Sequence, residues 1–230
     1  MHLPISDKIE LNILHQNSHQ AEKNKVKFNN YNLLCLNIMS SPGAGKTRLL
    51  EITLEDLSKK FHSAVLEGDM TTNLDAARLE KLNIPVVPIT TGRACHLDAN
   101  MVSGGLKLLE KKINPDLLDI LLVENVGNLV CPAEFEIGEH FKVALLSITE
   151  GEDKPLKYPI MFREADLILI TKVDLLPHLN FDINELKSNI ASTNPKADVI
   201  EISSITKSGF DLWHSWIDKK ILKFKNKKID

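Results

Sequence analysis

Residues 33–51, LLCLNIMSSPGAGKTRLLE, place an apolar run directly before a glycine-rich loop and a helix-like run directly after it. The apolar run predicts a buried strand over Leu33–Met39, and Thr47 opens the predicted helix. Backbone N–H groups of such a loop, together with the positive end of the helix dipole, bind polyphosphates. This strand–loop–helix unit therefore predicts a phosphate-binding loop, or P-loop.

The loop carries the side chains that P-loop proteins use on a nucleotide. Lys46 is expected to reach the β- and γ-phosphates, and the Thr47 hydroxyl is expected to ligate Mg²⁺. Ser40 stands where the pattern G-x-x-x-x-G-K-[ST] has its first glycine, so an ordinary glycine-rich turn is the alternative interpretation. The residues expected to bind phosphate are Gly43, Ala44, Gly45, Lys46, Thr47 and Arg48.

A second strand end predicts which base is bound. Residues 166–170, DLILI, read as a buried strand and are followed by TKVD, which matches the [NT]-K-x-D pattern of guanine-binding P-loop proteins. The Asp174 carboxylate would accept two hydrogen bonds from guanine, whereas adenine offers no matching pair of donors and leaves the carboxylate unpaired. The Lys172 stem would lie along the base. Taken alone, the tetrapeptide is equally typical of a solvated turn. The predicted base contacts are Thr171, Lys172 and Asp174.

A third segment predicts the loop that contacts guanine O6. The strand predicted over Asp198–Ile202 runs into Ser203 and Ser204, whose backbone N–H groups we expect at the base. The usual S-A-K pattern is altered, because Ile205 occupies the lysine position.

Composition indicates one domain with a sizeable core: the chain has 230 residues, of which 43% are hydrophobic. We predict an N-terminal extension over residues 1–32, a helix plus linker, and a P-loop GTPase domain over residues 33–230. The net charge of −3 implies no general attraction to nucleic acid. No apolar run is long enough for a bilayer, and the N-terminus does not resemble a signal peptide. Three widely spaced cysteines favour a reducing, cytoplasmic environment.

Strand and helix patterns alternate after residue 32, which predicts an α/β fold with a mainly parallel sheet and helices on both faces. The predicted strands are Leu33–Met39, Ser63–Glu67, Pro85–Ile89, Leu117–Val123, Lys142–Thr149, Leu167–Thr171 and Asp198–Ile202. The predicted helices are Thr47–Lys60, Leu74–Leu82, Leu97–Lys111, Asn184–Ser192 and Gly209–Phe224.

Two further strand ends carry candidate metal ligands. Cys95 and His96 follow the strand that ends at Ile89, and Cys131 lies just past another strand end, on the same expected edge of the sheet. Thiolate and imidazole are both good ligands for Zn²⁺ and Ni²⁺. Two structural cysteines and a capping histidine are the alternative interpretation, and Cys35 is expected in the core. Three ligands do not complete a tetrahedral site, so ligand counting suggests a two-fold dimer that shares the metal.

Several motifs together resemble the HypB family, the GTPases and nickel metallochaperones of [NiFe]-hydrogenase maturation. The matching stretches cover about residues 36–177 and read MSSPGAGKT, EGDMTTNLDAAR, TTGRACHLDANMV, LLVENVGNLVCP, SITEGEDKPLKYP and LILITKVDLLP. The resemblance implies a nucleotide-dependent homodimer of the SIMIBI class of P-loop GTPases, binding GTP or GDP with Mg²⁺. It also implies an Ni²⁺ or Zn²⁺ site from Cys95, His96 and Cys131 at the dimer interface. The implied partners are a HypA-type nickel protein and a hydrogenase large-subunit precursor.

The same resemblance implies roles for individual residues. Asp69 or Asp75 would lie in the first switch, and Glu124 would be the acid near Mg²⁺. Gly127 would donate its N–H to the γ-phosphate, so that the loop to Cys131 joins nucleotide state to metal ligand. Lys154 would reach phosphate across the dimer. The implied catalytic residues are Lys46, Thr47, Asp75 and Glu124.

The sequence departs from the family pattern in its N-terminal extension, and other functions are possible interpretations. The extension lacks the N-terminal C-x-x-C-G-C or His-rich nickel sites of some members, holding only His2, His15 and His19. A GTPase for urease or cobalamin-enzyme maturation is the nearest alternative. An ATP-dependent small-molecule kinase and a non-catalytic metal-binding module are the others. No side chain stands out as the group that positions water, which predicts slow turnover.

Overall fold

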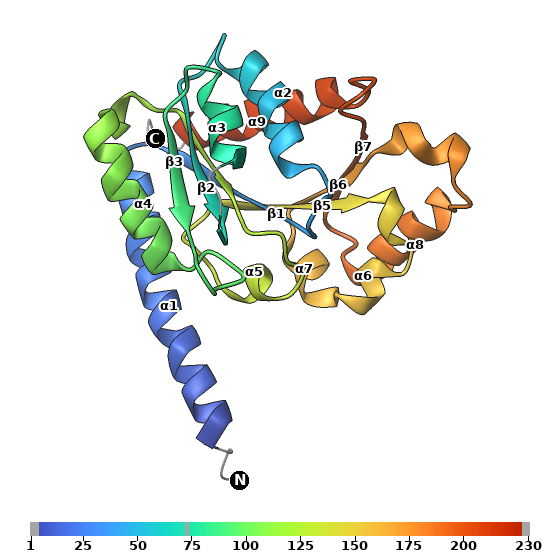
Figure 1. The fold of residues 1–230 in the computed structure, drawn as a ribbon, viewed down its shortest axis with the longest axis horizontal. Coiled ribbons are helices and arrows are strands. Elements are labelled where there is room, and N and C mark those ends of the chain that lie inside the picture. The colour runs from blue at the N-terminus through green and yellow to red at the C-terminus, as the bar shows by residue number, and fades with distance from the viewer. Residues whose placement is uncertain (1–4, 72–73, 227–230) are drawn as a thin grey trace.

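A computed structural model of the chain describes residues 5–71 and 74–226, with side chains of the first helix described from residue 12 onward. Within these residues one parallel sheet runs in the order β3-β2-β4-β1-β5-β6-β7 (Figure 1). The N-terminal His2 and the final lysines of the chain, Lys227 and Lys228, lie outside the described residues. The strands are β1 Leu34–Ser40, β2 Ser63–Asp69, β3 Val86–Thr90, β4 Ile120–Glu124, β5 Phe141–Ser147, β6 Leu167–Thr171 and β7 Asp198–Ile202.

The helices confirm the predicted alternation and add three short ones. The helices are α1 Ile5–Asn30, α2 Lys46–Leu57, α3 Leu74–Glu80, α4 Ala99–Lys112, α5 Cys131–Glu134, α6 Lys154–Lys157, α7 Pro159–Glu164, α8 Ile183–Thr193 and α9 Phe210–Asn226. The sequence missed α5, α6 and α7, because helices of four to six residues are too short to show a periodic apolar stripe. None of the described helices is long and apolar enough to cross a membrane.

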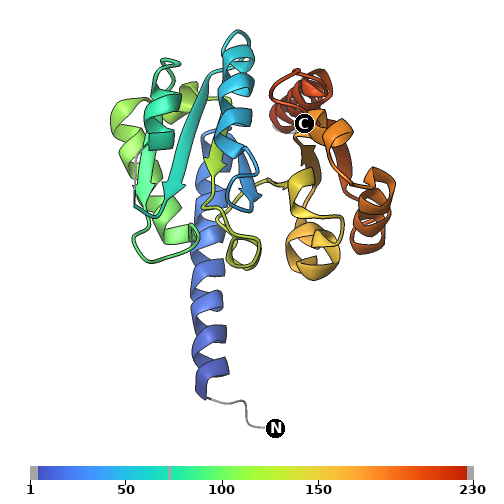
Figure 2. The same cartoon turned by 45° about the vertical axis from the view of Figure 1, so that its right-hand side comes forward.

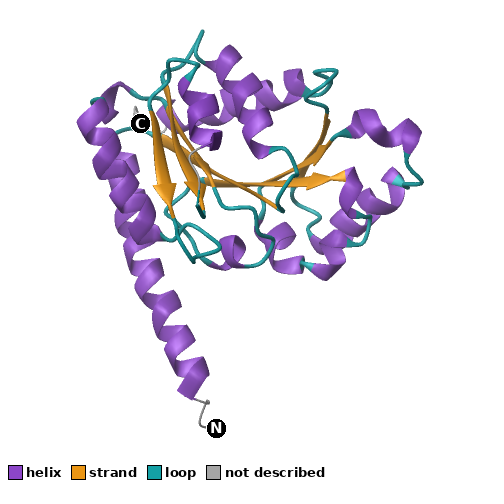
Figure 3. Ribbon diagram, in the orientation of Figure 1, coloured by secondary structure: helices purple, strands orange, loops and turns teal. Residues whose placement is uncertain are grey.

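The sheet is covered on both faces, which confirms the predicted fold class. Helices α2, α3 and α9 lie on one face, and α1, α4 and α5 to α8 lie on the other (Figure 3). Alternation along β1 explains this arrangement, since successive side chains of a strand point to opposite faces. Leu34, Leu36 and Ile38 join the core beneath α2 and α9, whereas Cys35 and Met39 join the opposite cores. Cys35 is therefore a core residue, as predicted.

Helix α1 docks through asparagines as well as apolar side chains. Asn17 Oδ1 accepts a hydrogen bond from the Ala99 N–H at 2.9 Å, at the start of α4. Asn24 Nδ2 donates to the carbonyl oxygens of Ala99 and Ile137 at 2.8 and 3.0 Å, and Phe28 is fully buried. The N-terminal half of α1 projects beyond the rest of the molecule (Figure 2). The helix was expected, but the division of the chain at residue 32 stays a prediction.

All strands run in the same direction, so their carboxyl ends lie along one edge of the sheet. In open α/β sheets, ligands bind outside this edge, where loops from neighbouring strands meet. The segments that end or follow β1, β2, β4, β6 and β7 carry the predicted nucleotide-binding residues other than Lys154, which follows β5, and the segments after β3 and β4 carry the predicted metal ligands. The fold thus places both sets of candidate residues on one side of the molecule.

Candidate functional site

A cavity of about 430 Å³ opens at the carboxyl ends of β1, β2 and β4. The P-loop forms one wall, and the segments after β2 and β4 form the others. Gly43 and Gly45 have φ angles of 77° and 100°, a left-handed backbone that favours glycine. The turn therefore explains both glycines of the motif. The lining includes the predicted Gly43, Gly45, Lys46, Thr47, Arg48, Asp69, Asp75, Glu124 and Gly127.

Lys46 projects its ammonium group into this buried site. The Nζ atom donates a hydrogen bond to Ser40 Oγ at 2.9 Å. Burial lowers the pKa of Lys46, and the nearby Glu124 carboxylate acts against this shift. Burying a cation without hydrogen-bond partners costs free energy. Ser40, which stands where the motif has its first glycine, supplies such a partner to Lys46.

Thr47 and Glu124 come together at the start of α2. Thr47 Oγ1 donates to Glu124 Oε1 at 2.7 Å, and both residues are buried. Burial raises the pKa of Glu124 to about 7, although Lys46 and Thr47 act to lower it. Glu124 Oε2 has no hydrogen-bond partner among the described residues. A hydroxyl beside a carboxylate with one free oxygen is a donor set that suits Mg²⁺.

Glu67 is a residue that the sequence reasoning missed. It lies on β2 directly opposite Glu124 on β4, lines the same cavity and is only 2% exposed. Burial, followed by the charge of Glu124, raises the pKa of Glu67 to about 8. Within the part of the chain that is described, its Oε2 atom also lacks a partner. The sequence does contain a signal for this residue, because an acidic side chain inside a buried apolar strand, here Glu67 in SAVLEGD, indicates a functional role.

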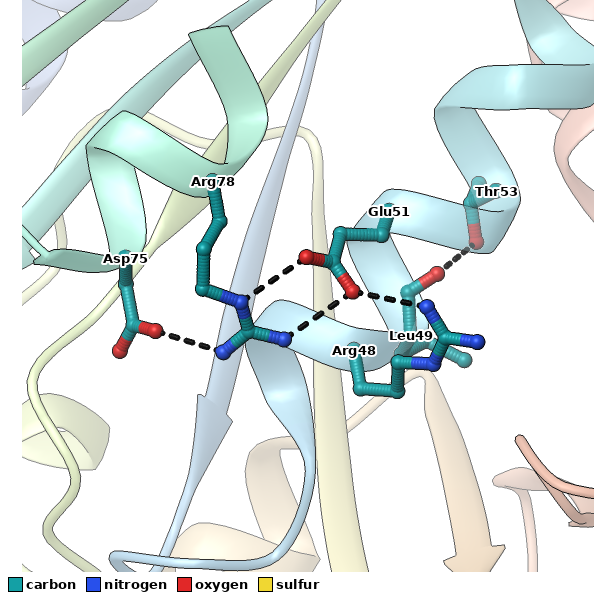
Figure 4. Close-up of polar contacts among 6 residues, drawn as sticks. All are labelled: Arg48, Leu49, Glu51, Thr53, Asp75 and Arg78. Atoms are coloured by element: carbon teal, nitrogen blue, oxygen red, sulfur yellow. Dashed lines mark hydrogen bonds and ion pairs between the residues drawn. The ribbon is translucent and has the colours of Figure 1, made fainter. Parts of the chain in front are cut away.

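An ion-pair network links α2 to α3 at the rim of the cavity (Figure 4). Arg78 donates from Nε and Nη2 to the two carboxylate oxygens of Glu51, at 2.9 and 3.0 Å, and from Nη1 to Asp75 at 2.8 Å. Arg48 donates to Glu51 at 3.0 Å. Burial acts to raise the pKa of Glu51, but hydrogen bonds from Arg78 and Arg48 outweigh it and lower this pKa. The network fixes Asp75, a predicted switch residue, beside the P-loop.

The predicted base-binding residues also come together. Thr171 Oγ1 donates to the Ala44 carbonyl at 2.8 Å, which ties the end of β6 to the P-loop. Lys172 has a left-handed backbone with a φ angle of 61°. The Asp174 carboxylate accepts a hydrogen bond from Ser203 Oγ, so the TKVD segment meets the loop after β7.

The loop after β7 is organised around Ser203. Its buried hydroxyl accepts hydrogen bonds from the backbone N–H groups of Ile205 and Thr206, both at 3.1 Å. Ser204 follows with partial exposure, and the Ile205 side chain is 79% exposed. The unusual residue at the lysine position therefore points away from the core and leaves the loop's hydrogen bonds intact.

Cys95, His96 and Cys131 form one cluster, with ligand atoms all within 4.8 Å of one another. The two Sγ atoms are 3.2 Å apart, and Cys95 Sγ is 3.9 Å from His96 Nδ1. Burial lowers the pKa of His96, which favours the neutral, metal-binding imidazole. The His96 ring also packs on Phe135, with ring centroids 4.1 Å apart. Two thiols and an imidazole are a donor set for Zn²⁺ or Ni²⁺.

The loop between β4 and α5 joins this cluster to the cavity. It begins after Glu124, passes Gly127 at the cavity wall and reaches Cys131. A Cβ atom added to Gly127 would lie 2.8 Å from Pro42 Cα, so only glycine fits this close approach to the P-loop. Burial and the neighbouring Cys95 raise the pKa of Cys131, whereas a hydrogen bond from Asn128 acts to lower it.

Lys154 lies apart from these residues within the single chain. It begins α6, and its Nζ atom is 5.2 Å from the centroid of the Tyr158 ring. It does not belong to the lining of the cavity described above.

Comparisons with known proteins agree with this geometry. The profile for the CobW/HypB/UreG nucleotide-binding domain matches residues 34–201. Hydrogenase maturation factor HypB of Azotobacter vinelandii is 48% identical over 214 residues, which cover 93% of this chain and 69% of the relative. The probable hydrogenase maturation factor HypB of Methanocaldococcus jannaschii is 38% identical, and the match covers 98% of this chain and 100% of the relative.

A solved structure supports the same assignment. The crystal structure of HypB from Helicobacter pylori in complex with nickel superimposes with a TM-score of 0.86 at 39% sequence identity. The superposition covers 90% of this chain and 96% of that one. Fold and sequence similarity thus extend over most of both proteins.

Proposed function

Because the chain belongs to the HypB family of hydrogenase maturation factors, we propose that it hydrolyses GTP and delivers nickel to a hydrogenase precursor. The observation that carries this proposal is the short loop from Glu124 to Cys131, which links a nucleotide cavity to a two-thiol, one-imidazole cluster. A nickel ion bound there is cargo, and the state of the nucleotide controls how tightly it is held.

The nucleotide site has the parts that phosphoryl transfer needs. Lys46 and the P-loop backbone hold and stabilise phosphate charge. Thr47 and Glu124 would hold Mg²⁺, with Glu67 as a second carboxylate beside them. When bound, Mg²⁺ neutralises charge on the phosphate oxygens. The free oxygens of Glu67 and Glu124 support this reading, since buried carboxylates are normally paired.

The metal cluster supports a homodimer as the working form. Three ligands from one chain leave a four-coordinate site incomplete, and a two-fold axis through the cluster would supply the same ligands again. Lys154 would then reach phosphate in the opposite protomer. A HypA-type nickel protein and the large-subunit precursor of a hydrogenase are the proposed partners, as donor and recipient of the metal.

We expect Asp174→Asn to change the base preference from guanine to xanthine. A carboxylate only accepts hydrogen bonds, whereas an amide both donates and accepts, which matches the altered edge of xanthine. Ser203 already orients the side chain through its hydroxyl. Equilibrium binding of GTP and XTP to both proteins checks this expectation. An unchanged preference for GTP in the variant would show that Asp174 does not contact the base.

The proposed function is tested in a bacterium whose own HypB has been deleted. The chain is expected to restore hydrogenase activity, and the variants Lys46→Ala and Cys131→Ala are expected to fail at equal protein levels. Restoration of urease or of a cobalamin enzyme, with no gain of hydrogenase activity, would replace the proposal by its nearest alternative. A preference for ATP over GTP would instead favour the kinase.

A further inference from the structure

Asn128 lies in the loop between β4 and α5 and contacts both halves of the site. Its backbone N–H donates to the carbonyl of Ser40, the last residue of β1, at 2.7 Å. Its side-chain Nδ2 donates to the Cys95 carbonyl at 3.4 Å, and its Oδ1 accepts from the Val130 N–H at 2.8 Å. One residue therefore bonds to the start of the P-loop, to the backbone of Cys95 and to the residue before Cys131.

We propose that Asn128 is the positioning residue through which the bound nucleotide sets the geometry of the two metal-binding thiols. The inference rests on the proposed function and names the residue that transmits its control. Asn128 follows Gly127, whose N–H is proposed to contact the γ-phosphate. A displacement of Gly127 on hydrolysis moves Asn128 with it. Its amide then moves the Cys95 carbonyl and the Val130 N–H together, and both thiols change position.

The surroundings of the loop favour transmission over local relaxation. Asn125 anchors its first turn, because its backbone N–H bonds to the Ile38 carbonyl of β1 at 3.0 Å. The Asn125 side chain accepts from the Leu97 N–H at 2.9 Å, two residues after Cys95. Gly127 is confined against the P-loop. The chain is thus fixed at Asn125, so a shift at Gly127 passes along the backbone to Asn128 and from there through the hydrogen bonds of its side chain.

Asn128 also supports both thiol-bearing residues through the backbone. Its Oδ1 accepts from the N–H of Val130, directly before Cys131, and its Nδ2 donates to the carbonyl of Cys95. Groups around a metal site that hold the ligands in place tune metal affinity, and their loss typically costs about 10–100-fold. One amide therefore fixes the backbone at both thiol ligands.

The test is the ratio of Ni²⁺ affinities with a non-hydrolysable GTP analogue and with GDP bound, measured by competition titration of the full chain. Asn128→Asp keeps the oxygen that accepts from Val130 but removes the donor to Cys95. In the wild type we expect a ratio within the usual range of allosteric coupling, about 5–150-fold. In Asn128→Asp we expect the ratio of affinities to fall to about 1. Asn128→Ala removes both side-chain bonds and is expected to give the same result, which keeps the test informative if one variant does not fold.

The matched control is Asn189→Asp. Asn189 also donates from Nδ2 to a backbone carbonyl, that of Glu152, at 3.0 Å, but it lies on α8. This variant is expected to keep the wild-type ratio. Folded Asn128 variants that lose metal affinity equally with both nucleotides, or not at all, would overturn the inference and leave the proposed function standing. A wild-type ratio of 1 would instead contradict nucleotide-controlled metal binding itself.

Discussion

Lys46→Ala is expected to abolish GTP hydrolysis, with a loss of at least about 100-fold in kcat. Lys46 is 8% exposed and lines the P-loop cavity, where one fixed charge acts on phosphate with little screening by water. The metal ligands lie on other loops, so Ni²⁺ affinity without nucleotide should stay close to that of the wild type. Phosphate release and metal titration on the same preparation measure both quantities.

The control for this variant is Lys59→Ala. Lys59 follows α2, and its side chain is 70% exposed in an ion pair with Asp56. Its removal should leave turnover unchanged, because exposed ion pairs contribute little. If Lys46→Ala hydrolysed GTP at the wild-type rate, the P-loop would not be the site of hydrolysis.

Cys131→Ala is expected to lower Ni²⁺ affinity by more than about 100-fold, because loss of a ligand should exceed the loss of a group that only supports one. Cys131 Sγ lies 3.2 Å from Cys95 Sγ, so the remaining thiol and imidazole cannot reproduce the donor set. GTP binding should survive, since Cys131 does not line the nucleotide cavity. The Ni²⁺–thiolate absorbance gives the affinity.

Cys35→Ala is the matched comparison for this variant. Cys35 is fully buried in β1 and belongs to the core beneath α4, so its loss should affect stability and leave Ni²⁺ affinity unchanged. Equal losses of affinity in the two variants would mean that metal binding follows overall folding and that the cluster is not the site.

The sequence predicted the sheet and the P-loop because each depends on residues that are close together in the chain. A single stretch of fewer than fifteen residues contains the alternating apolar residues of β1, Gly43, Gly45 and Lys46. All ends of the seven strands were placed to within three residues, since buried parallel strands have continuous apolar sequences.

Contacts between distant segments were not predictable in this way. Glu67 belongs to the nucleotide cavity only because β2 lies beside β4, which brings Glu124 opposite it. Asn128 reads as a spacer in ENVGNLVCP, and its bonds to Ser40 and Cys95 depend on how three loops meet. The buried side of α1 alternates asparagines with apolar residues, Asn17, Ala21, Asn24 and Phe28, so its docking does not show as a purely apolar period in the sequence.

We propose that nucleotide state controls the metal site through the loop from Glu124 to Cys131. The most direct measurement is a Ni²⁺ titration of the wild-type chain saturated first with GDP and then with a non-hydrolysable GTP analogue. We expect the two Ni²⁺ affinities to differ by at least about fivefold, the lower end of typical allosteric coupling. Equal affinities at full nucleotide saturation would contradict it.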